Sequence, residues 1–258
     1  MHTNKYIQIY NLFTSTKFGK KLGSSIRYER YKPAHITNMQ WEDLLGDDVN
    51  NLRHMLVILN IINQLQTNIP IEPEKMHLLK IAAVTHDWGE SIIGDITYEK
   101  KTESLENQEA KALETIVNEI VEDKNMKEEI LQTLSEIIFN PTTETGEIFN
   151  SIERIGYLNT AILSFEKSIQ FEKSDPKLFL SLQWLTNNTI IRQLDFMMKK
   201  SQKHQFLKDY LNNQRETIDQ IFAEIDSRSF DLYETGEQIE EARSTFEIVK
   251  KTWASTFK

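Results

Sequence analysis

The sequence predicts an all-α protein, because it has few turn-forming residues, enough core-forming residues and a helical periodicity of apolar positions. Only 8 glycines and 5 prolines occur among 258 residues, against typical frequencies of about 7% and 5%. These numbers leave few residues for the tight turns of a β-sandwich or a barrel. Hydrophobic residues make up 39% of the chain and aromatic residues 10%, which is enough to form a core and excludes wholesale disorder. No segment shows the period-2 alternation typical of a half-buried strand.

The expected helices follow one another along the chain with few interruptions. A buried helix is predicted over residues 52–65, after polar turn residues in which Asp47 or Asp48 is the candidate N-cap. Residues 74–88 resume the helical period after a proline-containing loop. Further helices are expected near residues 104–123, 127–140, 147–172, 176–200, 202–226 and 235–256.

Charge and composition narrow the classes of function and location. The formal net charge is −9, so nucleic-acid binding through phosphate contacts is not expected. There is no cysteine, so neither a disulfide framework nor a thiolate metal site is expected. The charge is uneven, because residues 1–35 carry seven Lys and Arg against one Glu. This basic segment is either a solvated terminus or a place where cations hold an anionic substrate. No apolar run is long enough for a membrane span and no secretory signal is recognisable, so we expect a cytoplasmic protein with no membrane partner.

Several ionisable residues interrupt apolar helical segments. His54 lies within the apolar run LRHMLVILNII, and His86 and Asp87 follow the run LLKIAAVT. Glu90 and Asp95 complete a ten-residue tract, HDWGESIIGD, with four ionisable groups. Taken singly, each histidine is readily explained as a hydrogen-bonded core or helix-end residue. Together, three crowded carboxylates would repel one another unless a cation neutralised them, and imidazole and carboxylate are suitable ligands for a divalent metal ion.

This pattern resembles the signature of the HD-domain metal-dependent phosphohydrolases. It is most similar to the 5′-deoxynucleotidase (YfbR-like) branch, which carries HD-x-x-E-x-x-x-GD after an upstream histidine. The resemblance covers residues 20–165 and implies a bundle of helices around one metal ion. The matching residues are His54, His86, Asp87, Glu90, Gly94 and Asp95.

The resemblance also implies the ligands of a divalent metal ion, which could be Mn, Co, Fe, Zn or Mg. They would be His54, His86, Asp87 and a carboxylate from a later helix. The family has Asp at this last position, and Glu153 stands there in NSIERIGYLNTAI. Glu is one methylene longer and can still ligate. The alternative for Glu153 is an ordinary exposed helix residue paired with Arg154 or a nearby lysine.

The remaining roles are transferred from the family position by position. Glu90 matches the carboxylate that orients or deprotonates the attacking water, and Asp95 matches the acid near the leaving 5′-oxygen. A phosphate-binding arginine precedes the first histidine in that branch, and Arg27 or Arg30 could take this role, with Arg27 preferred. Trp88 is either a stacking surface for a base or, more simply, part of the core.

The chain is therefore expected to have residues 1–165 as an HD phosphohydrolase domain and residues 166–258 as a helical extension packed on the same bundle. The resemblance implies hydrolysis of (deoxy)nucleoside 5′-monophosphates, with a small-molecule nucleotide as substrate and a homodimer as one expected assembly. Two alternatives stay open, namely hydrolysis of another nucleotide such as a triphosphate or an alarmone, and a degenerate HD protein that binds a nucleotide or a partner without turnover.

Overall fold

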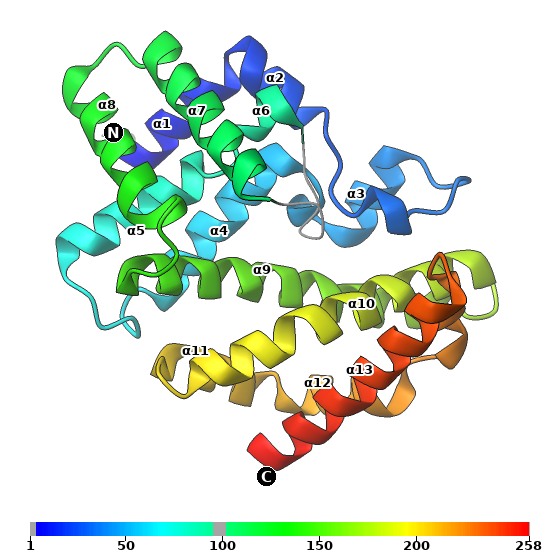
Figure 1. The fold of residues 1–258 in the computed structure, drawn as a ribbon. Coiled ribbons are helices and arrows are strands. Elements are labelled where there is room, and N and C mark those ends of the chain that lie inside the picture. Colours follow the sequence, from blue (N-terminus) through cyan, green and yellow to red (C-terminus); the bar gives the residue numbers. More distant parts are fainter. Residues whose placement is uncertain (1–3, 95–101, 258) are drawn as a thin grey trace. The chain divides into compact units, whose positions relative to one another are not determined.

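The computed structural model describes residues 4–94 and 102–257, and within these residues every regular element is a helix (Figure 1). The only extended pairing in the described residues is an isolated antiparallel bridge between Ile26 and Asn50. The predicted all-α class is confirmed. None of the described helices combines the length and apolar character that a bilayer span requires.

The chain forms two compact units that interleave along the sequence. Unit 1 contains residues up to Arg27 and the range Asp47–Ile152, and unit 2 contains Tyr28–Gly46 and the range from Glu153 onward. Helix α9, Glu144–Ser168, passes from one unit to the other without a break. The assignment of residues 1–165 to an HD domain and of residues 166–258 to an extension stays a prediction.

Unit 1 is built around helix α5, whose residues Leu79, Ile81, Ala82, Ala83 and Val84 are fully buried. The sequence period predicted one apolar face, yet the last turn of the helix, residues 81–85, is buried on every side, because α1, α4 and α8 pack against α5. The elements of unit 1 are α1 Lys5–Thr14, α2 Lys17–Gly23, η2 Asp47–Val49, α4 Asn51–Leu65, α5 Pro73–Thr85, α6 Glu90–Ile93, α7 Glu103–Ile120, α8 Lys124–Thr133, the π-helical turn η4 Leu134–Ile138 and the first part of α9.

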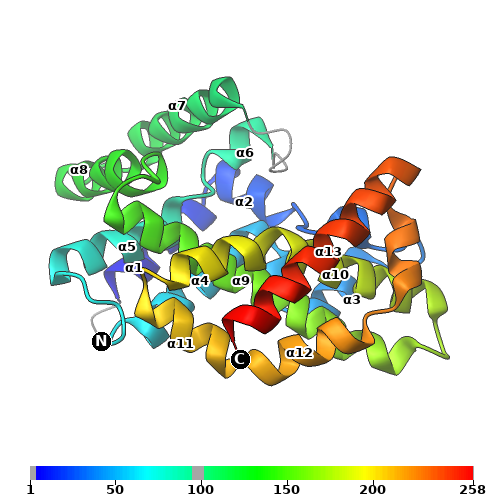
Figure 2. The ribbon, with the colours of Figure 1, turned by 60° about the horizontal axis from the view of Figure 1, so that its bottom comes forward.

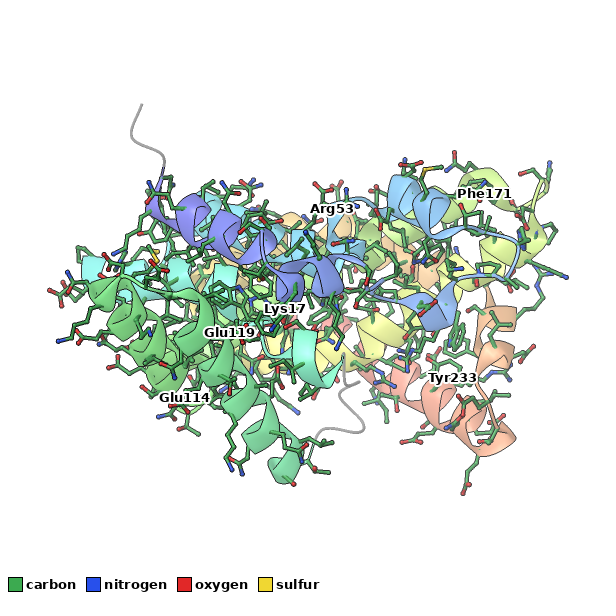
Figure 3. The ribbon with its side chains drawn as sticks, turned by 90° about the horizontal axis from the view of Figure 1, so that it is seen from above. Lys17, Arg53, Glu114, Glu119, Phe171 and Tyr233 are labelled. Atoms are coloured by element: carbon green, nitrogen blue, oxygen red, sulfur yellow. The ribbon has the colours of Figure 1, made fainter. Side chains whose placement is uncertain are left out.

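Two observations show how closely helices α2, α6 and α7 approach one another in unit 1. Lys17 of α2 pairs with Glu119 of α7 at 2.8 Å (Figure 3). A Cβ added to Gly89, just before α6, would lie 2.8 Å from the Glu109 carbonyl oxygen of α7. The close approach of α7 therefore requires glycine at this position.

Unit 2 is organised by the long helix α10, beside which the C-terminal helix α13 lies (Figures 1 and 2). Asn187 and Asn188 are buried in α10, and Asn188 donates a hydrogen bond to the Tyr31 hydroxyl and accepts one from Tyr233 at 2.9 Å. The elements of unit 2 are η1 Glu29–Tyr31, α3 Asn38–Leu45, the rest of α9, η5 Ile169–Phe171, α10 Pro176–Ser201, α11 Gln205–Asn213, α12 Arg215–Glu224, η6 Ser227–Leu232 and α13 Gly236–Thr256.

Two sequence expectations for local structure were wrong. Helix α4 has Asn50 as its N-cap, because the Asn50 side chain accepts hydrogen bonds from the backbone N–H groups of Leu52 and Arg53. Asp47 and Asp48 lie in the preceding 3₁₀ turn instead. The helix expected over 202–226 is two helices, because the chain breaks at Gln214 (φ −92°, ψ 4°) after a pair of asparagines, which favour turns over helix interiors.

Candidate metal centre

Three potential metal ligands meet where helices α4, α5 and α9 supply one side chain each. His54 lies in α4, His86 caps the C-terminus of α5 and Glu153 lies in α9. One ligand atom from each of these residues lies within 4.8 Å of the others. Glu153 directly follows Ile152, the last residue of unit 1, in the unbroken helix. Both histidines are buried, with exposures of 1% for His54 and 5% for His86.

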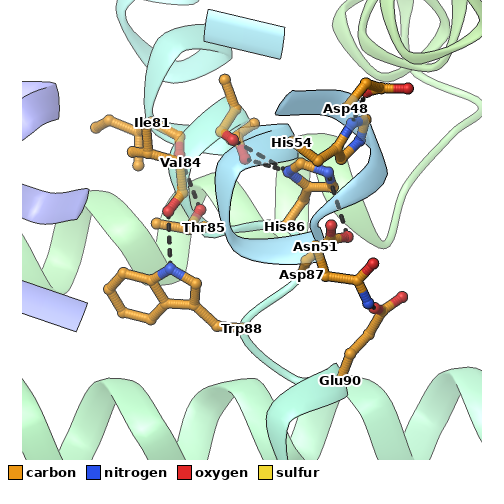
Figure 4. Close-up of polar contacts among 12 residues, drawn as sticks. Asp48, Asn51, His54, Ile81, Val84, Thr85, His86, Asp87, Trp88 and Glu90 are labelled. Atoms are coloured by element: carbon orange, nitrogen blue, oxygen red, sulfur yellow. Dashed lines mark hydrogen bonds and ion pairs between the residues drawn. The ribbon is translucent and has the colours of Figure 1, made fainter. Parts of the chain in front are cut away.

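His54 is fixed in one tautomer by Asp48 (Figure 4). A carboxylate oxygen can only accept, so the Nδ1 atom of His54 donates to Asp48 and the lone pair lies on Nε2. Burial lowers the pKa of His54 and the positive charge of Arg27 lowers it further, while Asp48 and Asp87 act in the opposite direction. The neutral imidazole, the form that binds a metal ion, is therefore favoured.

His86 is fixed in the same tautomer by the backbone. Its Nδ1 lies 3.2 Å from the carbonyl oxygens of both Ala82 and Ala83, which can only accept a hydrogen bond. In the neutral ring Nε2 therefore carries the lone pair, and this atom lies 3.2 Å from Oδ1 of Asp87. The two histidine rings meet edge to face, with their centroids 5.4 Å apart.

This arrangement fits a divalent metal ion. Both imidazoles have Nδ1 bound to an acceptor, which in the neutral ring leaves the lone pair on Nε2, the usual condition of metal-bound histidine. The carboxylates of Asp87 and Glu153 add oxygen donors and negative charge, a donor set that suits ions such as Mn²⁺, Fe²⁺, Co²⁺ and Zn²⁺. Glu153 is half-buried, and its neighbour Arg154 donates to Gln193 and stacks on Phe196. The full predicted ligand set stays a prediction.

The turn after α5 positions the acidic tract by local hydrogen bonds. The Trp88 indole Nε1 donates to the Val84 carbonyl at 2.7 Å and Thr85 donates to Ile81 at 2.8 Å (Figure 4). Trp88 is fully buried and stacks on Phe13, with ring centroids 4.6 Å apart. Trp88 is therefore a core residue, as the simpler interpretation held, and is not exposed for stacking on a base.

Glu90 opens helix α6 and faces Asn51, the first residue of α4 (Figure 4). The Asn51 Nδ2 donates to Oε2 of Glu90 at 3.2 Å. The chain then turns at Gly94, whose φ of +87° and ψ of 162° belong to a region populated essentially by glycine. Asp95, the predicted acid, lies outside the described residues, so its role stays a prediction.

The two candidate phosphate-binding arginines lie in different units. Arg27 belongs to unit 1, where its backbone N–H donates to the Val49 carbonyl at 2.7 Å, next to the bridge between Ile26 and Asn50. Its charge acts on His54, so the structure brings Arg27 to the surroundings of the histidine despite the long sequence separation. Arg30 belongs to unit 2, where it donates to the Tyr31 hydroxyl and stacks on the same ring.

Two buried residues of the site were missed by the sequence reasoning. Asp48 and Asn51 are 6% and 1% exposed and contact His54 and Glu90 directly. The only signal in the sequence was their position just before His54, where both look like ordinary turn and cap residues. Their burial depends on the pairing of residues 25–27 with residues 49–51. Backbone groups form this pairing, so it cannot be recognised from the residue types in the sequence.

Comparison with known proteins identifies the family. Neither the curated proteins nor the solved structures contain a significant match to the chain. The family model described as HD domain matches residues 46–195, which is 150 of the 258 residues and includes His54, His86, Asp87, Glu90 and Glu153. The chain therefore belongs to the HD-domain family, whose members bind divalent metal ions and are generally metal-dependent phosphohydrolases.

Proposed function

We propose that this protein hydrolyses phosphomonoesters of nucleosides, most simply (deoxy)nucleoside 5′-monophosphates. The observation that carries the proposal is the pair of buried histidines, each with Nδ1 bound to an acceptor, next to an acidic tract. A passive core would gain nothing from two buried imidazoles and several carboxylates gathered in one place. The small-molecule substrate and the absence of a nucleic-acid partner are parts of the same proposal.

The residues that would hold the metal ion are His54, His86, Asp87 and Glu153. A bound divalent ion polarises a phosphoryl oxygen and lowers the pKa of a water molecule. Asp48 and the carbonyl oxygens at the end of α5 keep the two imidazoles in the ligating tautomer and orientation.

Proton transfer would fall to two carboxylates. Glu90 would accept a proton from the attacking water while the water oxygen forms a bond to phosphorus. As the bond from phosphorus to the ester oxygen breaks, the leaving oxygen would take a proton from Asp95. Two carboxylates with opposite protonation states are a common way to perform such a displacement near neutral pH.

Arg27 would bind the phosphate of the substrate. A guanidinium can donate two parallel hydrogen bonds to phosphate oxygens. Arg27 is 9% exposed and its charge acts on His54, so a bound phosphate would compensate a positive charge that is already partly desolvated. Arg30 remains the alternative phosphate ligand.

Phosphate release from a panel of nucleotides tests the proposal. The panel contains 5′- and 3′-monophosphates, triphosphates and a guanosine alarmone, each with Mn²⁺, Co²⁺, Zn²⁺ or Mg²⁺. We expect phosphate release from 5′-monophosphates. The variant His86→Ala should lose both this release and metal binding. His35→Ala is the matched control, because His35 is 46% exposed in its side chain and pairs with Asp175. Preferential phosphate release from triphosphates or from the alarmone would show that the substrate class differs from the proposed 5′-monophosphates.

The variant Glu90→Ala separates turnover from metal binding. We expect it to bind Mn²⁺ with wild-type affinity and to lose about 10²–10⁴-fold in kcat, the range for a general base. Metal binding and nucleotide binding without turnover in the wild-type protein would indicate the degenerate binding protein instead. Light scattering of the same samples tests the expected homodimer.

A further inference from the structure

Asn51 occupies an unusual position for a polar residue at a helix start. It is 1% exposed and is the first residue of α4, while the capping of that helix is performed by Asn50. Asn51 and His54 are three residues apart and therefore lie on the same side of α4. No helix-capping role is left for Asn51, yet its amide is buried and contacts Glu90 of the acidic tract.

The hydrogen bond to Glu90 determines how the Asn51 amide is oriented. An ionised carboxylate only accepts, so the nitrogen of the amide must face Oε2 of Glu90, at 3.2 Å. The carbonyl oxygen Oδ1 then points away from that carboxylate oxygen. Oδ1 is buried, and no hydrogen bond to it is formed by any atom of the described residues.

A buried carbonyl oxygen requires a hydrogen-bond donor. Phosphate oxygens are acceptors near neutral pH and cannot supply the hydrogen. A water molecule can, and the neighbouring Glu90 is the residue proposed to accept a proton from water. One water molecule has two hydrogens, which matches the two acceptors, Oδ1 of Asn51 and the carboxylate of Glu90.

We propose that Asn51 is a further catalytic residue, which holds Glu90 through Nδ2 and orients the attacking water through Oδ1. This inference rests on the proposed phosphohydrolase function. The water oxygen forms the new bond to phosphorus, the proton nearest Glu90 moves to that carboxylate, and the hydrogen on Oδ1 stays with the product phosphate. The bond from phosphorus to the ester oxygen breaks, and that oxygen leaves with a proton from the acid of the site.

The first experiment compares Asn51→Ala and Asn51→Asp with the wild-type protein. We expect kcat to fall about 10- to 100-fold in both variants, which is part of the rate enhancement that a general base supplies. KM should change less than about threefold, and the Mn²⁺ affinity measured by calorimetry should be retained. Asn60→Ala is the matched control, since Asn60 is an exposed asparagine on the same helix. Wild-type kcat in Asn51→Ala, or loss of Mn²⁺ binding, would overturn the proposal.

The second experiment asks whether Asn51 acts together with Glu90. In a Glu90→Ala background, Asn51→Ala should lower kcat no further, because both residues serve the same water. If the losses in kcat of the two single variants instead multiply in the double variant, the proposal is contradicted. A rise in KM that disappears with a substrate lacking the sugar hydroxyls would show that Oδ1 binds the sugar instead. Absence of phosphate release from the wild-type protein would overturn the proposed function and this inference together, whereas wild-type kcat in Asn51→Ala would overturn this inference alone.

Discussion

Asp48 is the residue whose replacement tests the arrangement of the histidines most directly. Its side chain is 8% exposed and accepts the Nδ1 hydrogen of His54, whose side chain is 1% exposed. Asp48→Asn keeps the shape but replaces an anionic acceptor with a neutral one. Asp48→Ala removes the acceptor altogether. Both variants leave the ligand atoms of the site in place, so they test the partner of His54 and not the ligand itself.

The expected loss follows from the strength of that hydrogen bond. A hydrogen bond to a charged group is worth about 1.5–3 kcal/mol and a neutral one about 0.5–1.5 kcal/mol. Since about 1.4 kcal/mol corresponds to a tenfold change in affinity, Asp48→Asn should weaken Mn²⁺ binding about five- to tenfold. Asp48→Ala should weaken it about 10- to 100-fold, as is usual for partners of ligating histidines.

The measurement is a calorimetric titration of Mn²⁺ into protein stripped of metal by a chelator, with thermal unfolding recorded for each variant. The neighbouring Asp47→Asn is the matched control, because Asp47 is 65% exposed and pairs at the surface with Arg53 at 3.3 Å. Such a pair contributes little, so its affinity should stay within twofold of wild type. Wild-type Mn²⁺ affinity in a folded Asp48→Ala protein would refute the reasoning.

Three further predictions concern the turn after α6, the core of unit 2 and the pH dependence of stability. Gly94→Ala should lower the free energy of unfolding by about 1–3 kcal/mol, measured by urea denaturation, because φ is +87° at that residue; an unchanged value would contradict this. Asn188→Ala should cost about 1–3 kcal/mol in the same assay by leaving buried partners unsatisfied, whereas the exposed Asn213→Ala should cost less than about 0.5 kcal/mol. Burial, and then Arg27, lower the pKa of His54, so the unfolded state binds a proton first as the pH falls, and metal-free protein should lose stability below about pH 6.5. The variant His54→Gln should lose less of its free energy of unfolding between pH 7.5 and 5.5 than the wild-type protein. An equal loss in both proteins would argue against the lowered pKa.

Helices were predictable from the sequence because their signals are local. Residues 52–65 and 74–88 show apolar periods, and both segments are helical to within a few residues. The break at Gln214 was not predicted, since the apolar period continues across it. The choice of Asn50 over Asp47 or Asp48 as N-cap also depends on where the chain turns, which the residue types alone leave undecided.

Apart from residues that the family resemblance supplied, such as Glu153, the candidate site was predictable only where its residues interrupt an apolar pattern. His54 and His86 do so, and the structure brings them together with Glu153. Arg27 was preferred over Arg30 from the sequence, but the backbone bridge beside Arg27 has no side-chain signature and was not predicted. Asp48 and Asn51 escaped notice because their burial results from contacts between segments far apart in the sequence.

The interleaving of the two units has a consequence for the order in which the chain folds during synthesis. Tyr31 is 4% exposed, and the α10 residues that bond it, Ser181 and Asn188, lie 150 and 157 residues later. At about 5–20 residues per second, a ribosome needs roughly 8–30 s to add those residues. Throughout that time Tyr31 and its neighbours stay without their partners in unit 2. The N-terminal part of unit 2 therefore completes its folding only after α10 has been synthesised, although it precedes α10 by about 150 residues.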